Sequence, residues 1–504
     1  MDSNTLVFQK NPFVSQNKLN NDSIIIINEN GEIITSNSGW TNSFDFLESA
    51  IKITENNGTI YLNDINIYSN KKYKNGIDIT KNITIVGNNV RINGFDNDNL
   101  FNIKSNVTFK NIIFENTFDY LINVENTCIF DNCTFTNTYE KVINNNGKVK
   151  IINSKFSDIN AIYKLSKITG IDNIACIINN QNELEIINTT FDNIIMPHKI
   201  IINNNTTKEI GKTQIIYNSN NASINITNSS FNLIDGDLIA NFGKISINNS
   251  NFTKIETIIP NIEINLDNKV TFLNINAYSY NFEWDDDILT GPIYSTNFIS
   301  IDNSNFNNIS LKSQPQNFSS RVFCALRHLA DNKWYTLYIK LAHTMNVEGG
   351  VVYNTGTLII SQSKIENTKA TSAGAIYNTG NAKINKTTTN KILAYSGTGG
   401  VIINKGLMNI SNSYFNDSTL EITHTYRAGG CIYNSGTINM ENTTMNKTSG
   451  SKMRGGAIFN DGELNITRSA IIDSSAYDEG GLYSMMEQQI LILSFSKNVP
   501  ELME

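Results

Sequence analysis

Apolar and polar residues alternate within a short phrase that recurs along most of the chain. The phrase reads GKVKIINSKFSDI at Gly147–Ile159, GKISINNSNFTKI at Gly243–Ile255 and GELNITRSAIIDS from Gly462. In the first copy Val149 and Ile151 alternate with lysines, which is typical of a strand with one buried face. A phrase that returns at a nearly fixed interval predicts a stacked-repeat protein.

An aromatic residue marks the second half of most copies, and the first two intervals in this series are 21 residues each. A unit with two or three short strands and no helix predicts one coil of a right-handed, single-stranded parallel β-helix, an all-β fold. Equivalent residues would stack in an apolar row, an internal aromatic row and a hydrogen-bonded Asn/Ser/Thr ladder at the corner. Residues 60–484 would form roughly eighteen coils. The aromatic row comprises Phe114, Phe135, Phe156, Phe191, Phe231, Phe252, Phe306 and Phe415.

A second phrase joins the first in the C-terminal part of the chain. It reads GGVVYNTG at Gly349–Gly356 and returns as GGAIFNDG at Gly455–Gly462. Paired glycines permit a sharp bend or the close approach of another backbone, and Asn-x-Gly favours a turn. The expected structural turn positions are Gly349, Gly350, Gly374, Gly399, Gly400, Gly429, Gly430, Gly455 and Gly456.

These phrases divide the chain into six expected regions. They are an irregular leader at 1–40, a capping helix region at 41–59, coils with F-x-N/D-type repeats at 60–318, an atypical insertion at 319–346, coils with GGAIYN-type repeats at 347–484 and an atypical tail at 485–504. The helix is expected because Phe46, Leu47, Ala50 and Ile51 share one helical face, and it would cover the open edge of the first coil. The insertion is either a lateral binding loop, an ordinary excursion or a frameshifted stretch, and the tail indicates truncation or a frameshift.

Composition narrows the possible partners. Only 17% of residues are charged and the net charge is −7, with no basic stripe, so nucleic acid is not an expected partner. Five scattered cysteines without a CxxC pair predict neither a disulfide framework nor a zinc site. We find no signal peptide and no apolar run long enough to span a membrane.

The chain also resembles known families. The opening, from FDFLESAI through NGTIYL to KNITIVGNNVRINGF, is similar to the start of pectate-lyase-like β-helix proteins. The GGAIYN-type phrases and F-x-N/D phrases, such as FEN at Phe114–Asn116, resemble polymorphic outer-membrane protein repeats and, more closely, the adhesin-like proteins of methanogenic archaea. The resemblance implies a cell-surface or secreted role in attachment to cells or glycans. Since no surface anchor is visible, we expect this chain to be part of a longer surface protein.

Many β-helices process polysaccharides, so we searched for that chemistry. A hydrolase of this fold needs clustered aspartates and a Gly-His-Gly context, and none of the four histidines has that setting. A lyase would need calcium-binding carboxylates and an Arg or Lys base on neighbouring coils. We expect no carboxylates that recur at coil spacing on one face.

The best acidic cluster is NFEWDDDILTGP, where the repeat pauses. Its residues would bind Ca²⁺ through oxygens, or a sugar through the indole face and the carboxylates, unless they form an ordinary exposed loop. The candidate ligand-binding residues are Glu283, Trp284, Asp285, Asp286 and Asp287. We assign no catalytic residue, no metal ligand and no required cofactor, with Ca²⁺ as the one weak option.

The sequence therefore predicts a non-catalytic, adhesin-like protein, not an enzyme, that presents a repetitive β-helix face to glycans or other cells. A polysaccharide lyase or hydrolase on the same fold is one alternative, and a truncated fragment of a larger surface protein is another.

Overall fold

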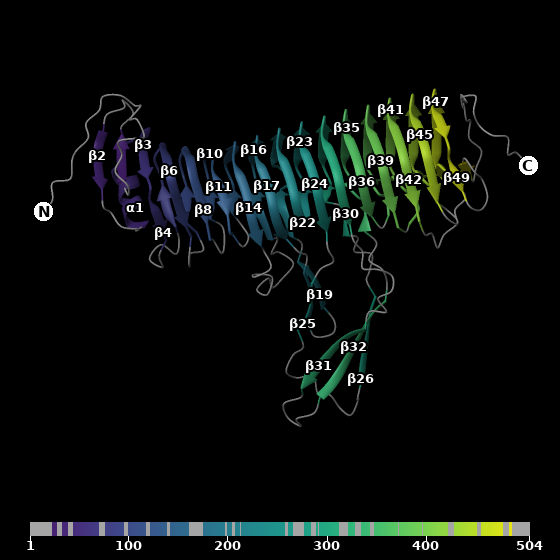
Figure 1. The fold of residues 1–504 in the computed structure, drawn as a ribbon, viewed down its shortest axis with the longest axis horizontal. Coiled ribbons are helices and arrows are strands. Elements are labelled where there is room, and N and C mark those ends of the chain that lie inside the picture. The colour runs from purple at the N-terminus through teal and green to yellow at the C-terminus, as the bar shows by residue number, and fades with distance from the viewer. Residues whose placement is uncertain are drawn as a thin grey trace, which may run out of the picture.

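The chain forms a long rod of stacked coils with a lobe on its side (Figure 1). This structure is a computed structural model. It describes residues 23–27, 33–38, 44–69, 76–94, 99–116, 121–138, 142–160, 175–196, 199–203, 207–211, 213–257, 261–265, 277–283, 289–290, 292–311, 321–327, 334–342, 347–370, 372–395, 397–421, 428–450, 455–476 and 483–485.

Each coil contributes one strand to each of three faces, and equivalent strands pair in parallel and in register along the rod. The first face takes the alternating opening of the repeated phrase, so one residue in two is buried. Its strands are β3 (Gly58–Asn63), β6 (Ile83–Asn93), β8 (Val107–Glu115), β10 (Thr127–Asp131), β13 (Lys148–Ile152), β16 (Glu183–Ile187), β21 (Ser223–Thr227), β23 (Lys244–Asn248), β29 (Phe298–Asp302), β35 (Thr357–Ser361), β38 (Asn381–Asn385), β41 (Leu407–Ser411), β44 (Thr437–Glu441) and β47 (Glu463–Thr467).

The second face carries the aromatic half of the phrase. It uses the second halves of β6 and β8 and the first half of β22 (Ser230–Asn241). Its other strands are β4 (Asn66–Tyr68), β11 (Thr134–Thr136), β14 (Lys155–Asn160), β17 (Thr190–Met196), β24 (Asn251–Thr257), β30 (Asn305–Leu311), β36 (Lys364–Ala370), β39 (Thr388–Ala394), β42 (Tyr414–Leu420), β45 (Thr444–Gly450), β48 (Ala470–Ile472) and β49 (Ser475–Ala476).

The third face carries the strand that precedes each Asn-x-Gly turn. The end of β22 belongs to it. The remaining strands are β5 (Ile77–Ile79), β7 (Phe101–Ile103), β9 (Ile122–Val124), β12 (Ile143–Asn145), β15 (Ala175–Asn180), β20 (Thr213–Asn218), β28 (Ile293–Ser295), β34 (Val352–Asn354), β37 (Ile376–Asn378), β40 (Ile402–Asn404), β43 (Ile432–Asn434), β46 (Ile458–Asn460) and β50 (Tyr483–Met485). The predicted all-β parallel β-helix is therefore confirmed.

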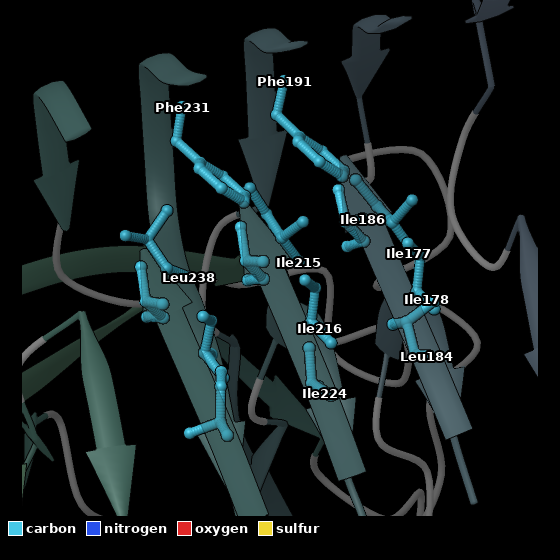
Figure 2. Close-up of a cluster of buried hydrophobic side chains, with 14 of the residues drawn as sticks. Ile177, Ile178, Leu184, Ile186, Phe191, Ile215, Ile216, Ile224, Phe231 and Leu238 are labelled. Atoms are coloured by element: carbon cyan, nitrogen blue, oxygen red, sulfur yellow. The ribbon is translucent and has the colours of Figure 1, made fainter. Parts of the chain in front are cut away.

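The interior is filled by stacked rows of identical or similar side chains. Phe156, Phe191 and Phe231 are fully buried and stack with ring centroids 4.6 and 4.5 Å apart. Figure 2 shows Phe191 and Phe231 above the Ile and Leu side chains of their own coils. Such offset stacks add to the free energy of burial, because each ring also contacts its neighbour through its face. The predicted internal aromatic row is thus present.

A ladder of buried asparagines forms the corner between the third and first faces. Asn404 is fully buried, and its Nδ2 donates to Asn434 Oδ1 at 2.8 Å and to the Gly406 carbonyl at 2.9 Å. Asn378 Nδ2 donates to Asn404 Oδ1 at 2.8 Å in the same way. Each amide therefore satisfies the turn of its own coil and binds the next coil, as the Asn-x-Gly pattern predicts.

A second ladder of hydroxyl groups lies between the first and second faces. Asn153 adopts a left-handed conformation with φ 52°, which turns the chain, and the next residue begins the ladder. Ser154 Oγ accepts a hydrogen bond from the Cys133 amide at 3.0 Å and donates to the Ile152 carbonyl at 2.7 Å. The pattern repeats at Thr189 and Ser229, and the thiol of Cys133 takes the same position one coil before Ser154, where it donates to the Asp131 carbonyl.

Glycines are present where backbones of neighbouring coils approach closely. A Cβ on Gly400 would overlap with the Gly430 carbonyl oxygen of the next coil. Gly349 has a φ of 80°, and a Cβ there would crowd the Val352 carbonyl oxygen. The glycine pairs therefore serve backbone contact and backbone conformation.

The N-terminal end of the rod is closed by two elements. The helix α1 (Phe44–Ile53) buries Leu47, Ala50 and Ile51 in the continuous core. The hairpin of β1 (Ser23–Ile27) and β2 (Ile33–Ser38) lies within the leader, and β1 pairs antiparallel with β3. The leader is thus not irregular throughout: the strand β1, rather than the helix, occupies the hydrogen-bonding edge of the first coil.

A lateral lobe is built from excursions of three coils (Figure 1). Its strands are β18 (Lys199–Asn203), β19 (Thr207–Gly211), β25 (Asn261–Asn265), β26 (Ala277–Glu283), β27 (Leu289–Thr290), β31 (Arg321–Arg327), β32 (Trp334–Ala342) and β33 (Val347–Glu348). β18 pairs with β25, and β26 pairs with β32, which is the second strand of a hairpin with β31. Most of the expected insertion at 319–346 is that hairpin, whereas the tail at 485–504 lies outside the described residues except for Met485.

The lobe corrects the expected number of coils. The described part of the rod contains fourteen first-face strands, β3 to β47, and not eighteen. The estimate assumed a constant coil length, but the chain leaves the rod after β17, β24 and β30 and returns only at β20, β28 and β34. No helix in the described residues is long and apolar enough to cross a membrane.

Candidate functional site

Glu283, the first residue of the acidic cluster expected to bind a ligand, lies in the lobe. Glu283 is the last residue of β26, and its backbone pairs in register with Ala342 of β32. The side chain of Glu283, and Trp284, Asp285, Asp286 and Asp287 entirely, lie outside the described residues. Ligand binding by this cluster therefore stays a prediction.

A different set of charged residues comes together on the second face. β22, β24, β30 and β36 are consecutive strands, and their register aligns Asp235 with Glu256, Glu256 with Ser310, and Ser310 with Lys369. We call these four residues the charged row. Consecutive members are one coil apart, about 4.8 Å, so the row spans roughly 14 Å along the rod.

A bend in each strand turns the charged row outward. Leu233 and Lys254 have φ values of 53° and 54°, and each stands two residues before its row member. In each strand one isoleucine lies between the bend residue and the row member. These residues, Ile234 and Ile255, point inward and are buried. The bend thus anchors an isoleucine in the core and presents the next side chain on the surface.

The two carboxylates differ from the lysine in exposure. Asp235 and Glu256 are half-buried, and one oxygen of each, Oδ1 and Oε1, is removed from solvent. Lys369 is exposed. Because solvent screens charges less where it is excluded, the acidic end of the row sets a stronger local field than a fully exposed pair would.

The charged row lies where the lobe begins. Glu256 is followed by Thr257, the last residue of β24, and the chain then enters the lobe segment that contains β25 and β26. Ser310 is followed by Leu311, the end of β30, and the chain then enters the segment with β31 and β32. Loops at the end of a rigid element are a common place for binding and catalysis.

This arrangement corrects the expectation that carboxylates do not recur at coil spacing on one face. Asp235 and Glu256 do so, each four residues after a member of the aromatic row, Phe231 or Phe252. The repeated phrase ends one residue earlier, so the charged row lies just outside it. Aligning the fourth residue after each phenylalanine would have revealed the pair.

The described residues do not form a metal site. Within them, no three His, Cys, Asp or Glu side chains lie close enough together to hold an ion. Two carboxylates and a lysine are also a poor donor set for Ca²⁺, which takes six to eight oxygen ligands. We therefore propose no metal-dependent step at the charged row.

The buried cysteines are not nucleophiles. Burial raises the pKa of Cys133 and of Cys431 to about 12, and it raises the pKa of Cys128 well above its usual value. A thiol reacts as its thiolate, so these side chains are inert at neutral pH. Cys324 lies in β31, where only the backbone is described.

A second aromatic column lies outside the core, on the third face. Tyr353 and Tyr377 stack with centroids 4.8 Å apart, and Tyr294 lies 5.7 Å from Tyr353. Tyr353 and Tyr377 are buried, and burial raises the pKa of Tyr294. The stacked ring faces are occupied by each other, so this column contributes to packing and offers no open face to a sugar.

No family model and no curated protein matches the chain. One solved structure, a PL6 alginate lyase in complex with a trisaccharide, matches 91% of this chain and 86% of its own at 11% identity, with a TM-score of 0.34. Another, a variant of the PL6 family alginate lyase AlyGC, covers 88% of both chains at 11% identity, with a TM-score of 0.19.

These comparisons correct the prediction that the chain is not an enzyme. Both matched structures are polysaccharide lyases, and no adhesin-like family is found. The expected non-catalytic role is therefore not kept. At 11% identity the likeness concerns the fold, so the chemistry of this chain must be argued from its own residues.

Proposed function

We propose that the chain cleaves a polysaccharide containing uronic acids, with the charged row as its reactive site. The alignment of two carboxylates and a lysine on one face, beside the root of the lobe, supports this proposal. Such polysaccharides occur in walls, capsules and extracellular matrices, so we expect the chain to act at the cell surface or outside the cell.

Elimination is the reaction that fits this set of groups. Glu256 and Lys369 are separated by two coils, about 10 Å, with the small side chain of Ser310 between them. A sugar ring above Ser310 would place its carboxylate near the Lys369 ammonium, which stabilises the charge that develops when the neighbouring C–H proton leaves.

Each group then has one role. The Glu256 carboxylate accepts the proton from the carbon next to the sugar carboxylate, and a carbon–carbon double bond forms as the glycosidic C–O bond breaks. The leaving oxygen takes up a proton from Glu256 or from water, so no water is consumed overall. Asp235, one coil away, is the acidic neighbour of Glu256 in the row.

A glycoside hydrolase is the second candidate. Asp235 and Glu256 occupy adjacent coils about 4.8 Å apart, near the separation of about 5 Å used by retaining enzymes. The products separate the two reactions, because elimination gives an unsaturated sugar that absorbs ultraviolet light, whereas hydrolysis gives only new reducing ends.

To test this, the protein is incubated with alginate, polygalacturonate, hyaluronan and neutral glucans. Ultraviolet absorbance of the products and the number of new reducing ends are both measured. We expect ultraviolet-absorbing product from at least one polyuronate and a loss of about 100-fold or more in Glu256→Gln. Lys369→Met should lose a similar factor, while Lys155→Met, an exposed lysine on the same face of a distant coil, should keep full activity. No product from any polyuronate, or full activity in Glu256→Gln, would refute the proposal.

A further inference from the structure

The three coils at 347–421 carry a net positive charge in an acidic protein. They contain six lysines, three glutamates and one aspartate, whereas the whole chain has a net charge of −7. All six lysines are exposed. They are Lys364, Lys369, Lys383, Lys386, Lys391 and Lys405.

Several of these lysines lie on the face that carries the charged row. Lys364 and Lys369 are on β36 and Lys391 is on the adjacent β39, while Lys386 occupies the corner just before β39. Lys364 forms an ion pair with Glu366 at 2.8 Å. Among the described residues no carboxylate forms an ion pair with Lys386 or Lys391, so both present positive charge to solvent.

An exposed aromatic residue continues this surface on the next coil. Tyr414 begins β42, pairs in register with Thr388 of β39 and is 40% exposed. Asn446 Nδ2 donates a hydrogen bond to its hydroxyl at 3.1 Å, which holds the ring against the rod. A fixed, partly exposed ring adjoining lysines suits a sugar, because the ring contacts the apolar face of the sugar while ammonium groups bind its carboxylates.

The register connects these groups to the charged row. Lys369 belongs to both, Lys391 is on the next coil, and Tyr414 is one coil beyond. At about 4.8 Å per coil, the distance from β30 to β42 is roughly 14 Å. In register, Lys369 aligns with Leu393 and Thr419, so Lys391 and Tyr414 lie two and five residues nearer the first face. A linear polysaccharide that crosses the second face obliquely would therefore pass from the reactive row onto Lys391 and Tyr414.

We propose that Lys386, Lys391 and Tyr414 form a binding surface for an anionic polysaccharide, which holds the substrate on the C-terminal side of the charged row. This inference rests on the proposed function for the identity of the bound chain. The binding itself does not depend on cleavage. Positive groups along the path raise the local concentration of a polyanion and orient it along the rod.

The test measures binding in the absence of cleavage. Alginate and polygalacturonate are titrated onto the full chain carrying Glu256→Gln, with dextran as the neutral probe and single-stranded DNA as a different polyanion. Adding Lys386→Gln and Lys391→Gln should weaken polyuronate binding by about tenfold at low salt and reduce its salt dependence. Tyr414→Ala should weaken it by a smaller factor and leave the salt dependence unchanged.

A matched control removes the same charge elsewhere. Lys148 is exposed and Lys150 is half-buried on the first face of an N-terminal coil, where each pairs with a glutamate of the next coil. Lys148→Gln with Lys150→Gln should leave binding unchanged. An equal loss in the control, tighter binding of DNA than of polyuronate, or no effect of the Lys386 and Lys391 changes would overturn the inference. If binding behaves as expected but no polyuronate is cleaved, the proposed cleavage reaction is refuted, whereas the proposed binding surface is confirmed.

Discussion

Thr389 is the weakest position in the aromatic row, and replacing it should stabilise the rod. The register places Thr389 between Ile365 and Phe415, where other coils carry phenylalanine, isoleucine or methionine. Its side chain is 1% exposed, and its Oγ1 has no hydrogen-bond partner among the described residues. The hydroxyl has therefore lost its water without gaining a protein partner.

The expected gain follows from this unpaired hydroxyl. Valine has nearly the same shape as threonine, so Thr389→Val keeps the packing and removes only the polar group. Burying a hydroxyl without a partner costs about 1–3 kcal/mol in proteins. We therefore expect Thr389→Val to increase the free energy of unfolding of this part of the rod by about 1–2 kcal/mol.

The chain offers a matched control one coil away. Thr368 is also fully buried, but its Oγ1 donates to the Gly374 carbonyl at 2.6 Å. Thr368→Val should destabilise by about 1–2 kcal/mol, because it breaks a buried hydrogen bond. The same substitution should thus have opposite signs at the two positions.

Both variants are compared by denaturant unfolding and by hydrogen exchange of the amides in β36, β39 and β42. Exchange is needed because a long stack of repeats need not unfold in one step. Destabilisation by Thr389→Val, or equal effects of both variants, would show that the hydroxyl is satisfied and would refute the reasoning.

Two further predictions concern the corner ladder and the thiols. Asn404→Ala should destabilise by about 2–4 kcal/mol in denaturant unfolding, because it removes the buried hydrogen bonds that join Asn404 to Asn378, Asn434 and the Gly406 carbonyl. The exposed Asn409→Ala should change the free energy of unfolding by less than about 0.5 kcal/mol, and equal effects of the two variants would contradict the role of the ladder. The pKa of about 12 for Cys133 and Cys431 in the folded protein lies above the usual value of 9.0, so their contribution to stability is complete below pH 9 and is lost as the pH rises toward 12. In a Cys324→Ser background, a thiol reagent at pH 8 should react with unfolded but not native chain, and rapid native labelling would show that the thiols are accessible.

The fold was predictable because the same physical requirement recurs in every coil. Phe156, Phe191 and Phe231 stack only if the coils are in register, so their spacing along the sequence reports the fold directly. The number of coils was not predictable, because the repeated phrase does not indicate how many residues between β24 and β28 belong to the lobe and not to the rod.

The charged row was harder to find because its position depends on backbone conformation. In most coils an asparagine or aspartate takes this left-handed bend, and both are recognisable as turn residues. Before Asp235 and Glu256 the bend falls on Leu233 and Lys254, which carry no such signal. The sequence of these coils therefore reads as a continuous strand, and the direction of the two carboxylates becomes evident only from the register.

The charged row differs from the side-chain ladders on the same face. On the second face, Asn416 Nδ2 donates to Asn390 Oδ1 and Asn446 Nδ2 donates to Asn416 Oδ1, both at 2.8 Å. Each amide in such a row is engaged by the coil before and the coil after, so it has little capacity left for a ligand. A row whose residue type changes from coil to coil, such as Asp235, Glu256, Ser310 and Lys369, cannot form this self-complementary ladder. The charged row is therefore not built for pairing between identical side chains, and the repeat is interrupted where this row lies beside the lobe.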